Sequence, residues 1–429
     1  MAVAYHTLAL TKDPAPEAKL EWAMFDRRVI QGQFPFSASD AFSKTSNGRV
    51  VRVSLRFAPP PLVSYVQLYT DDVVYGGPPK VVSADGDLLL IQMVVAVPDE
   101  SPSNFPDNFF VYKASPEWPQ LYALPTLGDD WFGRCQPTGI FHSGGDDFFA
   151  ANLQTLVGEN REEVAQLFRY SSLSKEWKLF HIDCPQDPEN GFYPICWHTD
   201  SVFCYGEYMC WADYHQGIVY CDVSTDVIEL RFVRFPGIET RLATCDGHGL
   251  PERVRTVAVN KGKIWFINID DGRFSSGGRS ECSVSMWTLK TLELKWEKEH
   301  TFALSDLWSV VKYQQSPLPQ SVPGFPLMDL HEDGVLHFIV RESIKSELDW
   351  RVTINVNTLA LDYEPYLNAI EEPYARRDVK NKFYNSALLA SKVCQCLDLP
   401  TVVVLQVVVR MTDCRGWRIP LVHLCSNLF

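Results

Sequence analysis

Two histidines flank one predicted turn and come nearest to a metal-binding pattern in this sequence. His331 and His337 lie on either side of that turn, with Asp329, Glu332 and Asp333 beside them. Alternate residues on paired strands share a face, so the two imidazoles can reach one site. Zinc takes three or four such ligands, and no third is identifiable. We therefore favour a surface hairpin over a metal site, and we expect no metal and no cofactor.

A thiol, a carboxylate and an imidazole stand together in CDGHG, Cys245–Gly249. A Cys–His nucleophile needs the thiolate held at hydrogen-bond distance from its base, and residues three apart in a Gly-rich loop rarely keep that geometry. The sequence also lacks the GxSxG, GxxxxGK[ST], GxGxxG and HExxH motifs. We read this segment as a loop and assign no catalytic residue.

Paired carboxylates are the remaining route to catalysis, because glycosidases use one as acid and another as base or nucleophile. Seven lie in or beside predicted turns: Asp85, Asp146, Glu207, Asp213, Asp222, Asp270 and Asp333. Aspartate is frequent in turns because its side chain bonds the local backbone. A structural role is therefore favoured, with a hydrolase or small-molecule site in a central cleft as the alternative.

Tryptophans serve either as core or as contact residues. Seven fall on predicted strands, where packing is the expected role: Trp177, Trp211, Trp265, Trp287, Trp296, Trp308 and Trp350. Trp118 and Trp131 fall in predicted loops, where an exposed indole is able to anchor a partner.

The elements that position these residues recur along the chain. LFRYSSLSKEWKLFHI, Leu167–Ile182, reads as two strands around a polar turn. It completes one of five similar units of two hairpins each: Val81–Pro125, Gly139–Ile182, Ser201–Pro236, Val257–Glu299 and Leu327–Tyr366. Their turn glycines, Gly86, Gly145, Gly206, Gly262 and Gly334, lie 59, 61, 56 and 72 residues apart.

A hairpin repeated about every 60 residues is typical of a propeller, since stacked sheets bury faces that one hairpin cannot. Two further strands within Arg49–Thr70 would form another blade or close the ring with a C-terminal strand. We predict five or six four-stranded blades; a pair of irregular β-sandwiches is the competing fold. Short helices are predicted at Asp306–Gln314 and, from the spacing of Phe383, Ala387, Leu388 and Ala390, at Asp378–Leu397.

The composition limits which binding partners and which cellular compartment we expect for this protein. The 429 residues are 46% hydrophobic and 13% aromatic and carry a net charge of −14, so we expect binding neither to nucleic acid nor to a membrane. The twelve cysteines are scattered without CxxC pairs, and the N-terminus is a poor signal peptide. We expect reduced thiols and a cytoplasmic or nuclear protein.

A family resemblance follows from a series of segments in order. YGEYMCWADYHQGIVYCDV (Tyr205–Val223) and the segments around Trp265, Trp287 and His337 are similar to the plant family called domain of unknown function 1618, which is expanded in grasses. EWAMFDRR (Glu21–Arg28) resembles its upstream part, so the likeness spans about residues 21–366. The hairpins also resemble those of F-box-associated and kelch-type propellers. The family has no assigned activity, so the resemblance implies no site residues.

These observations predict an all-β protein in three parts. Residues 1–20 form an extension, 21–370 a single β-propeller-like domain with a family core at about 205–345, and 371–429 a short helix and an atypical tail. The tail from about Pro400 does not match the family, so it is either a divergent end or a gene-model error.

The expected function is a non-enzymatic interaction module. It would present long polar loops to a protein or peptide partner: Val97–Asn108, Asp183–Tyr193, Gly237–Arg253 and Asp271–Cys282. The alternative is a small-molecule or glycan binder, or a hydrolase. No oligomeric state is indicated.

Overall fold

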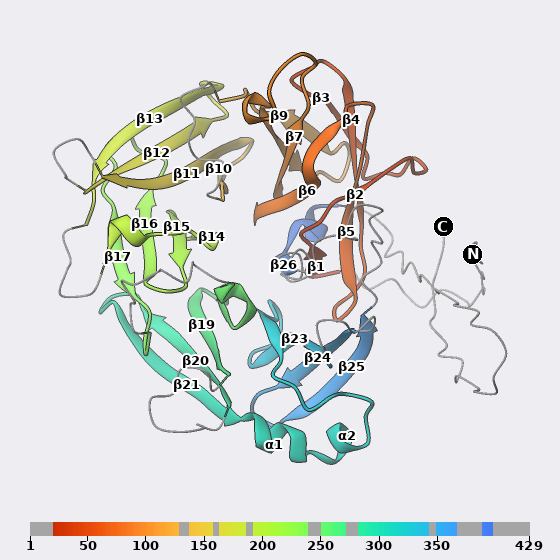
Figure 1. Ribbon diagram of the computed structural model, residues 1–429, viewed down its shortest axis with the longest axis vertical. Coiled ribbons are helices and arrows are strands. Elements are labelled where there is room, and N and C mark those ends of the chain that lie inside the picture. Colours follow the sequence, from red (N-terminus) through yellow and green to blue (C-terminus); the bar gives the residue numbers. More distant parts are fainter. Residues whose placement is uncertain are drawn as a thin grey trace.

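The computed structural model describes residues 20–127, 137–157, 163–185, 192–238, 250–271, 282–342, 349–366 and 388–397. These residues form six antiparallel-based sheets arranged in a ring, a six-bladed β-propeller (Figure 1). The prediction of an all-β propeller with five or six blades is confirmed, and the count is six.

Five sheets are consecutive four-stranded meanders, one for each predicted unit. The second sheet contains β6 (Val74–Asp85), β7 (Leu88–Val95), β8 (Asp107–Lys113) and β9 (Gln120–Ala123). The third contains β10 (Gly139–Gly144), β11 (Asp147–Val157), β12 (Glu163–Ser171) and β13 (Glu176–Asp183). The fourth contains β14 (Ser201–Tyr205), β15 (Tyr208–Asp213), β16 (Gly217–Asp222) and β17 (Arg231–Arg234).

The fifth sheet contains β18 (Arg255–Asn260), β19 (Lys263–Asp270), β20 (Ser283–Lys290) and β21 (Lys295–Ala303). The sixth contains β22 (Gly324–Met328), β23 (Val335–Arg341), β24 (Asp349–Asn355) and β25 (Ala360–Tyr366). All five predicted turn glycines join the first and second strands of their sheets, with φ between 54° and 71°. Glycine adopts this left-handed conformation without steric cost, which is why it marks the repeat.

The first sheet closes the ring with strands from both parts of the chain. It contains β1 (Ala23–Asp26), β2 (Ile30–Gln31), β3 (Ala41–Lys44), β4 (Val50–Arg56), β5 (Val63–Thr70) and β26 (Leu388–Ser391). β26 pairs antiparallel with β1 and contacts the innermost strands on both sides, β6 and β22. Figure 1 shows β26 and β1 side by side near the centre. Closure by a C-terminal strand, one of the two predicted options, is therefore confirmed.

The predicted helix at Asp378–Leu397 is wrong over its described part. Residues 388–391 are the strand β26, and only the short 3-10 helix η7 (Val393–Cys396) follows. Backbone pairing with β1 and burial of Leu388 outweigh the helical spacing of the apolar residues. The propeller thus extends past the boundary expected at residue 370; residues 378–387 and the tail from 398 lie outside the described residues.

The other helical segments are short and lie between strands. α1 (Leu304–Ser309) and α2 (Val311–Gln314) confirm the helix predicted near Asp306–Gln314. They fall between the fifth and sixth sheets and account for the longest glycine spacing. The remaining 3-10 helices are η1 (Pro102–Asn104), η3 (Pro194–Cys196) and η5 (Pro251–Arg253).

Tryptophans hold neighbouring sheets together. Trp211, Trp265 and Trp287 are buried, as predicted. Trp177 on β13 donates its indole N–H to Pro125 O at 2.8 Å, and Trp296 on β21 donates to Arg234 O at 2.7 Å. Each bond links the outermost strand of one sheet to the chain leaving the preceding sheet.

Two further tryptophans complete this set. Trp350 is partly buried on β24, as predicted, against the sixth-sheet core. Trp308 lies in α1, so its predicted place on a strand is wrong, although it packs against the same core.

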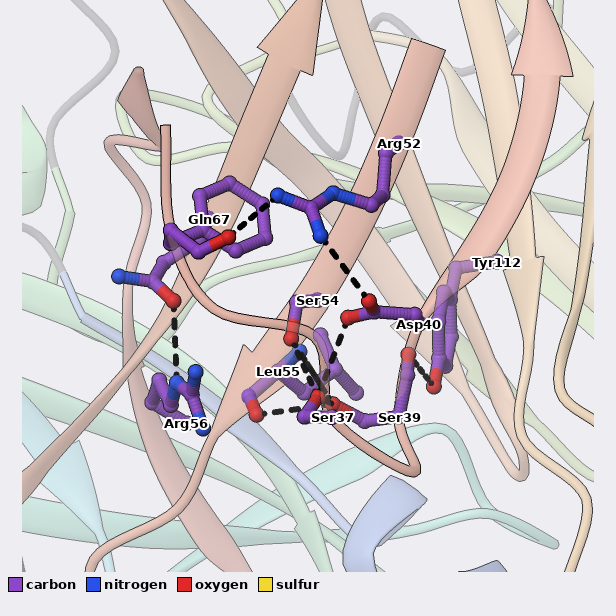
Figure 2. Close-up of polar contacts among 10 residues, drawn as sticks. Ser37, Ser39, Asp40, Arg52, Ser54, Leu55, Arg56, Gln67 and Tyr112 are labelled. Atoms are coloured by element: carbon purple, nitrogen blue, oxygen red, sulfur yellow. Dashed lines mark hydrogen bonds and ion pairs between the residues drawn. The ribbon is translucent and has the colours of Figure 1, made fainter. Parts of the chain in front are cut away.

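A polar network fixes the segment between β2 and β3 on the first sheet (Figure 2). The hydroxyls of Ser37, Ser39 and Ser54 bond one another at 2.8–3.1 Å, and Tyr112 of β8 donates to Ser39 O at 2.9 Å. Buried Arg52 pairs with Asp40 at 3.3 Å. The segment is thereby bonded to both the first and the second sheet.

Candidate functional site

A cavity of about 400 Å³ lies at the junction of the first three sheets. Its lining includes the polar residues Asp87, Lys113, Ser115, Gln120 and Asp146, and Ala114, Pro116 and Cys396 complete the wall. Cavities that hold small ligands or side chains begin near 300 Å³. This cavity is the candidate functional site.

Strand connectivity defines the face on which the cavity opens. The turns between first and second strands and between third and fourth strands lie at one end of every meander, here called the turn face. Asp87 and Asp146 follow first turns, and residues 114–116 belong to the β8–β9 turn. The four loops predicted to bind a partner join strands at the opposite end. Val97–Asn108 is fully described there, while the other three lie largely outside the described residues.

Lys113 is a buried cation at the end of β8, with 8% of its surface exposed. Its ammonium donates to Gly145 O at 2.8 Å and to Asp146 Oδ1 at 2.5 Å, both in the β10–β11 turn. Burial of an unpaired charge is costly, so these bonds are what allow a lysine here. The hydrogen bond from Lys113 lowers the pKa of Asp146, which keeps that exposed carboxylate ionised.

Asp87 faces the cavity from the β6–β7 turn. Its Oδ1 is buried and lies 3.7 Å from His142 Nε2. His142 Nε2 also lies 3.2 Å from Gly145 O, the carbonyl that accepts from Lys113. No hydrogen-bond donor among the described residues reaches Asp87 Oδ1. The Asp87 side chain is 16% exposed and lines the cavity, so the accessible part of its carboxylate can accept a hydrogen bond from a ligand.

Asp85 stands behind this turn and does not line the cavity. Burial raises the pKa of its carboxyl, opposed by the His142 backbone N–H, which donates to Oδ2 at 2.8 Å. Raised carboxyl pKa values suit general acids, but the hydrogen bond from His142 ties Asp85 to β10. The structure thus brings predicted residues Asp85 and Asp146 to one neighbourhood, and only Asp146 into the cavity.

Trp118 lies in the β8–β9 turn whose first residues form the cavity wall. It is 80% exposed, which confirms the expectation of an exposed indole for this residue. Trp118 lies in sequence between the lining residues Pro116 and Gln120, and an exposed tryptophan there offers a large rigid contact surface.

The other predicted carboxylates do not join the cavity lining. Buried Asp213 accepts backbone N–H groups of His198 and His215, which makes it a structural residue. Asp222 bonds Ser224 in a local turn. Asp333 pairs with Lys261 at 3.1 Å on the surface, Glu207 is an exposed turn residue, and Asp270 ends β19.

His331 and His337, the two histidines considered as metal ligands, lie in different environments. His337 is buried, with Nε2 3.1 Å from Asp329 Oδ2 and Nδ1 2.9 Å from Thr353 Oγ1. His331 is exposed and pairs with Glu21. Among the described residues, no group of three or more His, Cys, Asp or Glu side chains could hold a metal ion.

Of the thiols on the fourth sheet, those of Cys210 and Cys221 are buried and that of Cys204 is partly buried. Burial raises the pKa of Cys204 and Cys210 well above the ordinary value, and that of Cys221 to about 12. Such thiols stay protonated and are poor nucleophiles. CDGHG (Cys245–Gly249) and Trp131 lie outside the described residues.

Sequence reasoning missed Asp87 and Lys113. Both had a local signal: Asp87 directly follows the turn glycine Gly86, and Lys113 directly follows the apolar and aromatic run FFVY in β8. Their convergence depends on how the second and third sheets stack, which neither signal contains.

The fold and its repeats define the class of this protein as a six-bladed β-propeller. A family model described as "Protein of unknown function (DUF1618)" matches residues 211–337, from β15 into β23. The match lies within the core expected at about 205–345. The wider likeness over residues 21–366, the plant origin and the kelch and F-box resemblance stay predictions. A search of curated proteins finds no match.

Three of the solved structures that match this chain show distant likeness. The GH32 beta-fructofuranosidase BmSUC1 of Bombyx mori aligns at TM-score 0.31 and 10% identity, over 67% of this chain and 62% of that enzyme, less than two thirds of its length. The WD40 domain of SCAP from fission yeast aligns at TM-score 0.30 and 9% identity, over 77% of both chains. The catalytic domain of Coprinopsis cinerea GH62 alpha-L-arabinofuranosidase aligns at 0.28 and 8%, over 80% and 96%. Likenesses at this level support no conclusion about activity.

Among the described residues, no helix is long and apolar enough to cross a membrane.

Proposed function

We propose that this protein is a non-enzymatic binding module that presents its turn face to a protein or peptide partner. The observation that carries the proposal is Trp118, held 80% exposed beside the lysine–carboxylate cavity. The cytosol or nucleus is the proposed location, and nucleic acid and membranes are not proposed as partners.

The energetics favour an anchor at this position. A tryptophan buries about 150–250 Å² when covered, and such residues dominate the binding energy of interfaces. Trp118 sits between Pro116 and Pro119, with Pro119 followed directly by β9. The two prolines limit the conformations of the turn, so less entropy is lost on binding.

The loops of the opposite face remain a second prediction for the contact surface. The alternative, a glycan binder or hydrolase, would use the same cavity. Whether it could be a hydrolase depends on the carboxylates near that cavity. The hydrogen bond from Lys113 lowers the pKa of Asp146, which makes this carboxyl a poor general acid. Asp85, whose pKa is raised by burial, does not line the cavity. Both observations support binding over acid–base catalysis.

A site-specific photo-cross-link tests the proposal. Benzoylphenylalanine replaces Trp118 in one full-length variant and Leu292, a fully exposed residue of the β20–β21 turn, in the control. We expect one dominant protein cross-link in host extract from position 118 and not from position 292. With the purified partner, Trp118→Ala should weaken binding at least about tenfold, in line with a central interface tryptophan.

Identical cross-links from the two positions would contradict the proposal. So would turnover of a glycan by the purified protein that Asp146→Asn abolishes.

A further inference from the structure

The charges that line the cavity do not balance. Its described lining holds two carboxylates, Asp87 and Asp146, against one ammonium, Lys113. That ammonium already donates to Gly145 O and Asp146 Oδ1. The cation is therefore largely engaged within the protein, and one carboxylate faces the cavity without a matching charge in the lining.

Asp87 is that carboxylate. Its buried Oδ1 has no hydrogen-bond donor among the described residues and lies 3.7 Å from His142 Nε2, and its side chain is 16% exposed. Asp85, two residues earlier, adds a further acidic group behind it. A cationic donor that enters the cavity would form a charge-assisted hydrogen bond with the accessible part of the Asp87 carboxylate.

The rim suits the same kind of ligand. Trp118 presents an exposed indole beside the wall, and a cation over an indole face gains about 0.5–2 kcal/mol. The net charge of −14 attracts basic partners over distance.

We propose that this cavity receives a basic side chain, arginine or lysine, from the partner. This inference rests on the proposed function and names the chemistry that its site recognises. The guanidinium or ammonium donates to Asp87 inside the cavity, and its aliphatic stem crosses the rim near Trp118.

The alternatives fit less well. An acidic side chain would be repelled by Asp87 and Asp146, because Lys113 already donates to Gly145 O and Asp146 Oδ1. A neutral sugar would satisfy Asp87 through a hydroxyl but would leave the excess negative charge uncompensated. A cationic side chain compensates the excess negative charge and also donates a hydrogen bond.

Small probes test this recognition without the partner. Saturation-transfer NMR with the full chain compares N-acetyl-arginine methylamide with its neutral isostere N-acetyl-citrulline methylamide, and with the glutamate analogue and methyl glucoside. We expect the arginine probe to bind at least about tenfold more tightly than the citrulline probe, and Asp87→Asn to remove that difference.

Two substitutions of opposite charge at Gln120 distinguish a change in cation recognition from a folding defect. Gln120 is exposed and lines the cavity. Gln120→Lys should weaken the arginine probe about two- to fivefold and Gln120→Glu should strengthen it by a similar factor, whereas a folding defect would shift both the same way. Glu297→Gln, in a surface pair with Lys290 on the fifth sheet, is the matched control and should change nothing.

Equal binding of arginine and citrulline probes, or preference for methyl glucoside, overturns the inference. If a partner still cross-links through position 118, the proposed function stands while the basic-side-chain inference fails. If the arginine probe binds as expected but position 118 captures nothing, the proposed function fails and the cavity stands as a cation site.

Discussion

Replacing Arg52 with methionine should destabilise the first sheet by about 3–5 kcal/mol, because it leaves a buried carboxylate without its cation. Arg52 and Asp40 are both buried, with side chains 8% and 6% exposed, and their N–O distance is 3.3 Å (Figure 2). Arg52 also donates to Phe34 O at 2.5 Å. Its guanidinium carbon lies 4.2 Å and 4.3 Å from the ring centroids of Phe34 and Phe36.

Three contributions to the loss of stability in Arg52→Met lead to this expected value. Removing one partner of a buried pair costs about 3–5 kcal/mol, mostly from the charge left behind. Two partly exposed cation–π contacts add about 0.5–1 kcal/mol each. Methionine retains much of the apolar stem and recovers part of that loss.

A double replacement separates the two causes. Arg52→Met combined with Asp40→Leu should recover at least half of the loss, since no charge remains buried. The assay is urea unfolding followed by circular dichroism, with hydrogen exchange across β3–β5 to localise the change. If the double variant loses as much stability as the sum of the single variants, the unpaired carboxylate is not the cause and the reasoning is refuted.

Three further replacements probe other parts of the ring. Gly217→Ala places a Cβ 2.2 Å from Val233 O within the paired strands β16 and β17, and should cost about 3 kcal/mol in urea unfolding; an unchanged midpoint would contradict the clash. Val393→Asp buries a charge behind the closing strand and should lower stability by at least about 3 kcal/mol, while Lys392→Asp on the exposed side should not; equal effects would contradict closure by β26. Burial would raise the pKa of Asp329, but hydrogen bonds from His337 and two backbone N–H groups outweigh it and lower the pKa below 3.8. The stabilisation by ionised Asp329 is present above its unfolded-state pKa and is lost as pH falls through its folded-state pKa. In acid unfolding, the stability difference between the wild type and Asp329→Asn should therefore shrink over that pH range. A difference that stays constant with pH would contradict this prediction.

The sequence predicts the repeated sheets well because their signals are local. Gly206, for example, needs positive φ in a tight turn, and the apolar strands on either side follow within a few residues. The same turn chemistry at five places is enough to predict the blades. The irregular spacing before Gly334 also has a local cause, the inserted helices α1 and α2.

The closing strand shows where local reasoning fails. Leu388–Ser391 has the sequence LLAS, which favours helix over strand by propensity. Its partner β1 is more than 360 residues earlier, and pairing there satisfies its backbone while its position in the inner ring buries Leu388. Only the assembled ring supplies that interaction.

The cavity depends on the same closure. Its wall is assembled from the turns of the second and third sheets and from Cys396, which lies in η7 directly after β26. Asp87 and Lys113 take their positions within one sheet, but Asp146 reaches Lys113 only through the packing of the next sheet. The chemistry of the site is therefore a product of contacts between sheets, whereas the residues that carry it follow ordinary turn and strand patterns. This separation explains why the sequence predicts the scaffold in detail and only part of the site, and it implies that a variant that opens the ring will also remove one wall of the cavity.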